Sequence, residues 1–131
     1  FFGTCDPPEN AGFDFEYFRS PVREDLRGLY NSNAIFAATS ISEGFGLTGA
    51  EALMCGCGLV ASVNGGHLEY ATHNKTALMF EPGDSRKLAE SIAALAENST
   101  MRQTLARNGN EEIGKFNWER SVELFEKALL K

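Results

Sequence analysis

The strongest constraint on the fold is a strand–helix–strand pattern near the middle of the chain. A short apolar run at 34–39 is followed by a glycine-rich loop, a helical pattern over 47–55 and a second apolar run at 59–63. Short buried runs separated by a helix are typical of parallel strands joined by a crossover. The pattern therefore predicts an α/β fold, with a Rossmann-like, mostly parallel sheet flanked by helices.

The remaining segments extend this alternation. Further strands are expected at 1–3, at 77–80 and at 13–18, the last because Phe13, Phe15 and Tyr17 alternate with other residues. Further helices are expected after Ser20-Pro21, at Asp84, near Ser99 and at Asn117. Their apolar stripes should face the core, and these are Val22, Leu26, Leu29 and Tyr30, then Leu88, Ile92 and Leu95, then Met101 and Leu105, then Trp118, Val122, Phe125 and Leu129.

Two carboxylates bracket the loop that follows the first apolar run. Glu43 lies just after the predicted strand, and Glu51 lies eight positions later, two turns inside the helix. Loops at the carboxyl ends of parallel strands face a crevice, and the unpaired N–H groups of a helix start attract anions. Glycines 44, 46 and 49 would let a ligand approach the backbone closely. The sequence therefore predicts a cradle for a pyrophosphate, with one carboxylate on each side.

Two interpretations of this pair remain open from the residues alone. Because two acids would repel an anion, Glu43 and Glu51 fit best as acceptors for neutral hydroxyls at the two ends of a ligand. Alternatively, Glu43 only favours the positive end of its own helix, and Glu51 is a solvated surface residue. The helix should bury a stripe with Glu51 at its rim, and the stripe consists of Leu47, Ala50, Leu53, Met54 and Cys57.

Composition excludes several other classes of protein. The net charge of −6 comes with scattered Lys and Arg residues, which argues against nucleic-acid binding. No apolar run approaches the roughly 18 residues that span a bilayer, and no signal peptide is present, so a cytoplasmic location is expected. The three cysteines, Cys5, Cys55 and Cys57, indicate neither a disulfide framework nor a zinc site. His67 and His73 lack partners for a metal, and none is expected.

Length and the start of the chain bear on domain organisation. The 131 residues suit one domain, and 1–131 is expected to be a single unit without a second domain. The chain opens on Phe1-Phe2 rather than on Met. We therefore expect it to be a piece of a longer protein, truncated at its N-terminal side.

The segment Glu43-Gly44-Phe45-Gly46-Leu47-Thr48-Gly49-Ala50-Glu51 resembles the signature of family-4 (group 1) glycosyltransferases of the GT-B fold. That signature is a Glu, seven residues and a second Glu, within the carboxyl-terminal, donor-binding domain. Residues 26–36, Asn64-Gly65-Gly66, Glu69, 76–84 and Phe116-Asn117-Trp118 are similar to the family as well. The resemblance covers most of residues 20–131.

The resemblance implies roles for matching residues. Glu43 would hold hydroxyls of the donor sugar and is the one residue assigned to catalysis. Gly44, Phe45, Gly46 and Leu47 would contact the sugar and diphosphate through their backbone. Thr48 would meet a phosphate, and Glu51 would bind the ribose hydroxyls. The implied reaction transfers a sugar from a UDP- or GDP-sugar to an acceptor hydroxyl with retention, without a metal or other cofactor, as in polysaccharide synthesis.

The family also supplies parts that these residues lack. A basic stretch like G-R-x-x-x-x-K-G, from the first strand–helix segment of this domain, does not precede Phe1, and the acceptor-binding domain is absent. The resemblance thus predicts that this chain alone is inactive and that its partners are the donor and the missing domain, through which peripheral membrane association is conceivable. The alternatives are a nucleotide-sugar epimerase or phosphorylase of the same fold, and a non-catalytic scaffold module.

Overall fold

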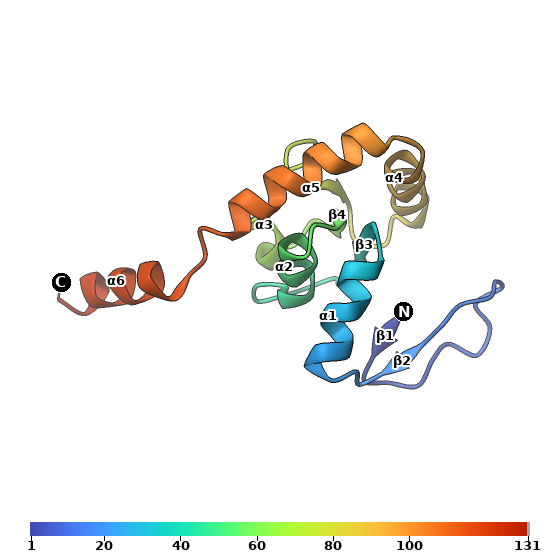
Figure 1. The fold of residues 1–131 in the computed structure, drawn as a ribbon, viewed down its shortest axis with the longest axis horizontal. Coiled ribbons are helices and arrows are strands. Elements are labelled where there is room, and N and C mark those ends of the chain that lie inside the picture. Colours follow the sequence, from blue (N-terminus) through green and yellow to red (C-terminus); the bar gives the residue numbers. More distant parts are fainter. Residues whose placement is uncertain (131) are drawn as a thin grey trace.

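The central element of the fold is a three-stranded parallel sheet, seen in a computed structural model that describes residues 1–130 (Figure 1). Its strands are β3 (Ile35–Ala38), β4 (Gly58–Ser62) and β5 (Leu78–Phe80), in the order β3-β4-β5. Helix α2 (Leu47–Met54) connects β3 to β4, and the short helix α3 (Gly65–Leu68) follows β4. The predicted α/β fold with a parallel sheet is confirmed.

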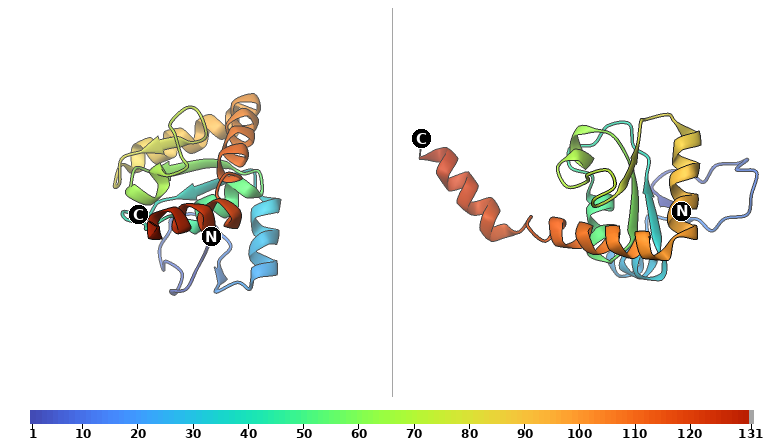
Figure 2. Two further views of the ribbon diagram at one scale, coloured as in Figure 1. Left: turned by 90° about the vertical axis from the view of Figure 1, so that its left-hand side faces the viewer. Right: turned by 90° about the horizontal axis from the view of Figure 1, so that it is seen from above.

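Helices cover both faces of this sheet because side chains alternate along β4. Leu59 and Ala61 point into a core with Leu53 of α2 and Ile113 of α5 (Ser99–Ile113). Val60 points the other way, into a core that contains Leu95 of α4 (Ser85–Glu97). All five residues of β4 are buried, as expected for a strand between two layers. The layers are visible in the right-hand view of Figure 2.

A second, smaller sheet lies at the N-terminal end. It pairs β1 (Phe2–Gly3) with β2 (Phe18–Arg19), again in parallel, and α1 (Arg23–Ser32) follows it. The prediction of a strand over 13–18 is wrong, because only its last residue is in a strand. The rings of Phe13 and Phe15 instead pack on Phe1, with centroids 6.1 and 5.3 Å from it. A local aromatic cluster, rather than a sheet, thus explains the alternation.

The last helix, α6 (Trp118–Leu129), extends away from the rest of the molecule (Figures 1 and 2). Its start is as predicted, with Asn117 capping the backbone N–H of Arg120. The expectation that Trp118 lies in the core is wrong for the described residues, since this side chain is 83% exposed and no residue of α6 is buried. The spacing correctly identified an amphipathic helix, but nothing in residues 1–130 covers its apolar stripe. None of the described helices combines the length and apolar character needed to cross a membrane.

Candidate functional site

The loop that connects β3 to α2 places Glu43 at the carboxyl edge of the sheet. Glu43 is half-buried and Gly44 is exposed. Gly46 is the N-cap of α2, and its φ of 83° lies in the left-handed region that L side chains rarely adopt. This single residue turns the chain from the loop into the helix. The structure therefore has Glu43 in the loop and Glu51 on the helix, as the sequence predicted.

The N-terminus of α2 differs from that of four other helices. In α3, α4, α5 and α6, an Asn or Asp side chain accepts a hydrogen bond from the amide three residues on. In α2 no side chain does so, and the N-cap is a glycine. The interpretation of Glu43 as a cap for its own helix gains no support from this geometry. In the first turn of α2, the N–H of Gly49 donates to the carbonyl oxygen of Gly46 at 3.1 Å. The N–H groups of Leu47 and Thr48, in contrast, make no hydrogen bond within residues 1–130 and are left for a ligand or water.

A buried polar network holds the loop from the side of β4. The hydroxyl of Ser62 and the side-chain amide of Asn64 both donate to the carbonyl oxygen of Ser40, at 2.5 and 3.0 Å. The Oδ1 atom of Asn64 also accepts from the N–H of His67 and so caps α3. This cap starts the short helix α3 beside the Glu43 loop.

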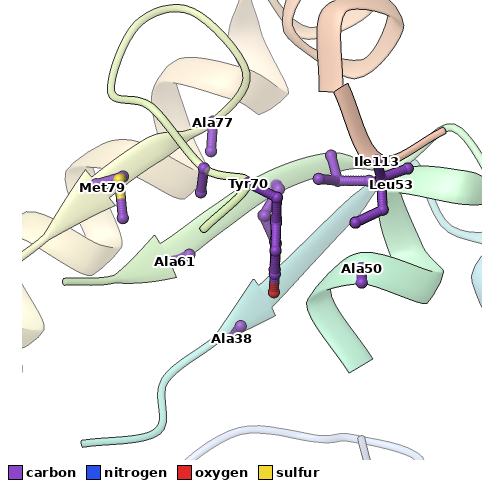
Figure 3. Close-up of a cluster of buried hydrophobic side chains, with 10 residues drawn as sticks. Ala38, Ala50, Leu53, Ala61, Tyr70, Ala77, Met79 and Ile113 are labelled. Atoms are coloured by element: carbon purple, nitrogen blue, oxygen red, sulfur yellow. The ribbon is translucent and has the colours of Figure 1, made fainter. Parts of the chain in front are cut away.

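Two residues of this region contact the loop closely. A Cβ on Gly66 would lie only 2.8 Å from the carbonyl oxygen of Glu43, so only glycine fits there without a backbone shift. The hydroxyl of Tyr70 donates to the carbonyl oxygen of Gly46 at 2.7 Å. Figure 3 shows the Tyr70 side chain between the sheet and α2. Burial and the nearby Glu43 carboxylate raise the pKa of Tyr70 to about 12, which keeps it a neutral donor at physiological pH.

His67 is fully buried beneath the same loop. Its Nδ1 atom lies within 3.0 Å of both the Ser62 carbonyl oxygen and the Asn64 side-chain nitrogen. Its Nε2 atom faces Gly46 and has no hydrogen-bond partner within residues 1–130. No sequence motif assigns His67 to catalysis, and in the structure its buried ring lies beneath the loop and supports it. Among the described residues, no group of three or more His, Cys, Asp or Glu side chains could hold a metal ion.

The second carboxylate occupies the exposed side of α2. The Oε2 atom of Glu51 accepts a hydrogen bond from the hydroxyl of Tyr30, 3.1 Å away on α1. No ion pair within residues 1–130 involves Glu43 or Glu51. Sequence reasoning placed Tyr30 only in an apolar stripe and missed this contact. The signal was present, because a tyrosine in an aliphatic stripe needs a partner for its hydroxyl once buried.

The buried side of α2 is rotated relative to the predicted stripe. Ala50 and Leu53 are buried, and Cys57 is buried just after the helix. Leu47 and Met54 were expected to face the sheet, but they are 67% and 65% exposed. Leu47 and Met54 share one exposed face of α2 with Glu51, at i, i+7 and i+4, whereas the buried side consists of Gly49, Ala50, Ala52 and Leu53. Leu47 is consequently accessible beside Gly46.

Comparisons with known proteins show the family to which the chain belongs. Residues 15–112 match the model of the family described as glycosyl transferases group 1. An uncharacterised glycosyltransferase of Methanocaldococcus jannaschii is 36% identical over 99 residues, which cover 76% of this chain and 28% of that protein. The chain thus spans under a third of this relative's length.

Solved structures show the same fold. Anabaena HepE, in complex with UDP and glucose, superposes with a TM-score of 0.75 at 27% identity, covering 88% of this chain and 31% of HepE. The C-terminal domain of a glycosyl transferase group 1 family protein from Francisella tularensis has a TM-score of 0.70 at 24% identity, covering 76% of this chain and 52% of the domain structure. The chain belongs to the group 1 glycosyl transferase family and has the fold of its GT-B C-terminal domain.

Proposed function

We propose that this chain is the donor-binding part of a retaining glycosyltransferase that moves a sugar from a nucleoside diphosphate sugar to an acceptor hydroxyl. The observation that carries the proposal is the pair of carboxylates on either side of an uncapped helix N-terminus. Within residues 1–130, neither Glu43 nor Glu51 forms an ion pair, and no side chain caps the first turn of α2 between them. This order of groups matches a ligand with hydroxyls at both ends and a diphosphate between them.

Each group in the proposal has a separate part of the donor. Glu43 accepts from hydroxyls of the transferred sugar and acts at the reacting end. The backbone of Gly44, Phe45, Gly46 and Leu47, with Thr48, contacts the sugar and the diphosphate. Glu51 accepts from the ribose hydroxyls. The complex of the related HepE with UDP and glucose supports a nucleotide and a sugar as the two halves of the ligand.

Electrostatics of the backbone make a metal unnecessary in this proposal. The leaving diphosphate develops charge during transfer, and fixed N–H groups at the start of α2 stabilise that charge. Basic side chains from sequence outside residues 1–131, together with an acceptor-binding domain, complete the site. We expect activity in the cytoplasm and no loss of activity in EDTA.

The test is donor binding and turnover by the intact protein. UDP-, GDP-, ADP- and dTDP-sugars are screened against the wild type, Glu43→Gln and Glu51→Gln by calorimetry and by release of the nucleotide. We expect one donor to be turned over, and each substitution to reduce kcat/KM at least tenfold, about 1.4 kcal/mol of transition-state stabilisation. Wild-type behaviour in both variants would contradict the proposal and favour a scaffold role.

The products distinguish the other reactions that this fold could carry. A transferase yields a glycosylated acceptor and a nucleoside diphosphate, with the anomeric configuration of the donor. A phosphorylase yields a sugar phosphate in the presence of inorganic phosphate, and an epimerase yields an altered sugar without an acceptor. Analysis of the products by NMR separates these outcomes.

A further inference from the structure

The hydrogen bond between Tyr30 and Glu51 has a direct consequence for the site. Glu51 lies on the exposed side of α2, and a free glutamate side chain there would sample many rotamers. Its Oε2 atom is instead 3.1 Å from the Tyr30 hydroxyl. Its Oε1 atom makes no hydrogen bond within residues 1–130. One carboxylate oxygen is therefore fixed by the protein, and the other is left for a ligand.

The Tyr30 ring is a rigid point in the fold. It is 4% exposed and packs edge-on against Phe2 and Phe36, with centroids 5.8 and 5.4 Å away. The backbone carbonyl of Tyr30 also accepts from the thiol of Cys57 at 3.2 Å. Residues of β1 and β3, and Cys57 just before β4, thus hold the tyrosine that positions Glu51.

The protonation state of Tyr30 suits a permanent donor. Burial, the hydrogen bond to Glu51 and the charge of that carboxylate all raise the pKa of Tyr30 well above its ordinary value. The hydroxyl therefore keeps its proton at any pH at which the protein would work. A lysine or arginine donor would neutralise the negative charge of the Glu51 carboxylate. A neutral hydroxyl donor satisfies one carboxylate oxygen and leaves that charge in place.

We propose that Tyr30 is a positioning residue, which holds the Glu51 carboxylate ready to accept hydrogen bonds from the vicinal diol of a ribose. This inference rests on the proposed function, because it assigns Tyr30 to the nucleotide end of that site. A side chain fixed before binding loses less rotamer freedom when the ligand arrives, so the hydrogen bond raises affinity without touching the ligand. Tyr30 also contributes selectivity for ribose over nucleotides that lack the diol.

The experiment measures binding of nucleotides to the intact protein by calorimetry. The probes are UDP and GDP, each compared with its 2′,3′-dideoxy form, and the variants are Tyr30→Phe, Glu51→Gln and the double variant. Tyr17→Phe is the matched control, since the Tyr17 hydroxyl donates to the Cys5 carbonyl in the N-terminal loop. Because phenylalanine keeps the ring packing of Tyr30, the Tyr30→Phe variant should remain folded. Thermal unfolding without nucleotide checks this for each variant.

We expect Tyr30→Phe to weaken binding of the ribose nucleotide about three- to tenfold. Binding of the dideoxy nucleotide should be unchanged, and the double variant should bind no more weakly than Glu51→Gln alone. Equal weakening for both nucleotides, or wild-type affinity in Tyr30→Phe while Glu51→Gln is impaired, would overturn the role of Tyr30 only. Wild-type affinity in Glu51→Gln would instead overturn the proposed function.

Discussion

The two ends of the site are built in different ways. The Glu43 loop depends on close backbone approach and on buried groups that follow β4, among them Gly66, His67 and Tyr70. Glu51 stands on a regular helix and depends on one hydroxyl from α1. The position of Glu43 therefore depends on many close contacts of the loop. The position of Glu51 depends on the geometry of α2 and on a single hydrogen bond. Substitutions of the groups that support the loop should consequently cost stability, whereas substitution of Glu51 itself should cost affinity alone.

Gly46→Ala should show the largest effect on stability. The residue has a φ of 83°, and a Cβ would lie 2.6 Å from the His67 ring and 2.9 Å from the Tyr70 hydroxyl. Left-handed strain and overpacking together should lower the free energy of unfolding by about 3 kcal/mol, measured by urea denaturation. The stability control is Gly44→Ala, since a Cβ on Gly44 meets open space. Equal losses in the two variants would contradict the difference between the two ends.

Tyr70→Phe should have the next largest effect. It removes the shortest of three hydrogen bonds to the Gly46 carbonyl, which keeps the bonds from the N–H groups of Gly49 and Ala50 at 3.1 and 3.2 Å, while the ring packing is retained. The expected loss is about 1 kcal/mol in the free energy of unfolding. Tyr17→Phe, at the hydroxyl that reaches Cys5, should cost less. A loss in Tyr70→Phe no greater than in Tyr17→Phe would mean that the loop does not depend on this hydrogen bond.

Rising alkaline pH should remove the stability contributed by Cys57, near the helix end, before that contributed by Tyr70, at the loop end. Burial raises the pKa of Cys57, beside Tyr30, to about 11 from an ordinary value of 9.0, and burial and Glu43 raise that of Tyr70 to about 12 from 10.0. Because the unfolded chain gives up these protons first, the stability that they contribute is complete below about pH 9 and is lost as the pH rises through 11 and then 12. The free energy of unfolding should fall by on the order of 1 kcal/mol between pH 8 and pH 10.

The order of the two titrations is tested with single variants. Urea denaturation at a series of pH values should show a flatter decline between pH 9 and 11 in Cys57→Ala. Tyr70→Phe should flatten the decline above pH 10 instead. An unchanged profile in Cys57→Ala would show that the helix end does not titrate first.

Glu51→Gln should have the smallest effect on stability. The side chain is exposed, and the amide oxygen of glutamine can still accept from Tyr30. The free energy of unfolding should change by less than about 0.5 kcal/mol, as for other surface substitutions. A loss above about 1 kcal/mol would mean that the helix end also carries structural energy, and the contrast between the two ends would fail.

Much of the fold was predictable because local patterns report burial and capping. The runs at 34–39, 59–63 and 77–80 became β3, β4 and β5, and Asp84 and Asn117 cap helices as expected. The errors share a cause. Alternation over 13–18 and the stripe of α6 describe side chains that could be buried, and whether a partner covers them is not a local property.

In the candidate site, too, local sequence patterns predicted some features and missed others. The positions of Glu43 in a loop and of Glu51 on a helix were readable from the sequence, because both follow from the register of one strand–helix unit. The residues that support them could not be predicted from the sequence, because Tyr30 is 21 residues from Glu51, and Tyr70 is 24 residues from Gly46. Contacts over such separations arise only when the sheet brings the ends of β3 and β4 together.

The sequence by itself determined the family, the alternation of strands and helices, and the carboxylates that would face a ligand. These depend on residue type and spacing within about a dozen residues, where backbone geometry is fixed by 3.6- and 2-residue periods. Only the tertiary structure decided how each carboxylate is held, with a packed glycine and buried polar network beneath Glu43 and one tyrosine hydroxyl beside Glu51. Hydrogen bonds and close packing between distant segments need positions in space, and no local pattern encodes them.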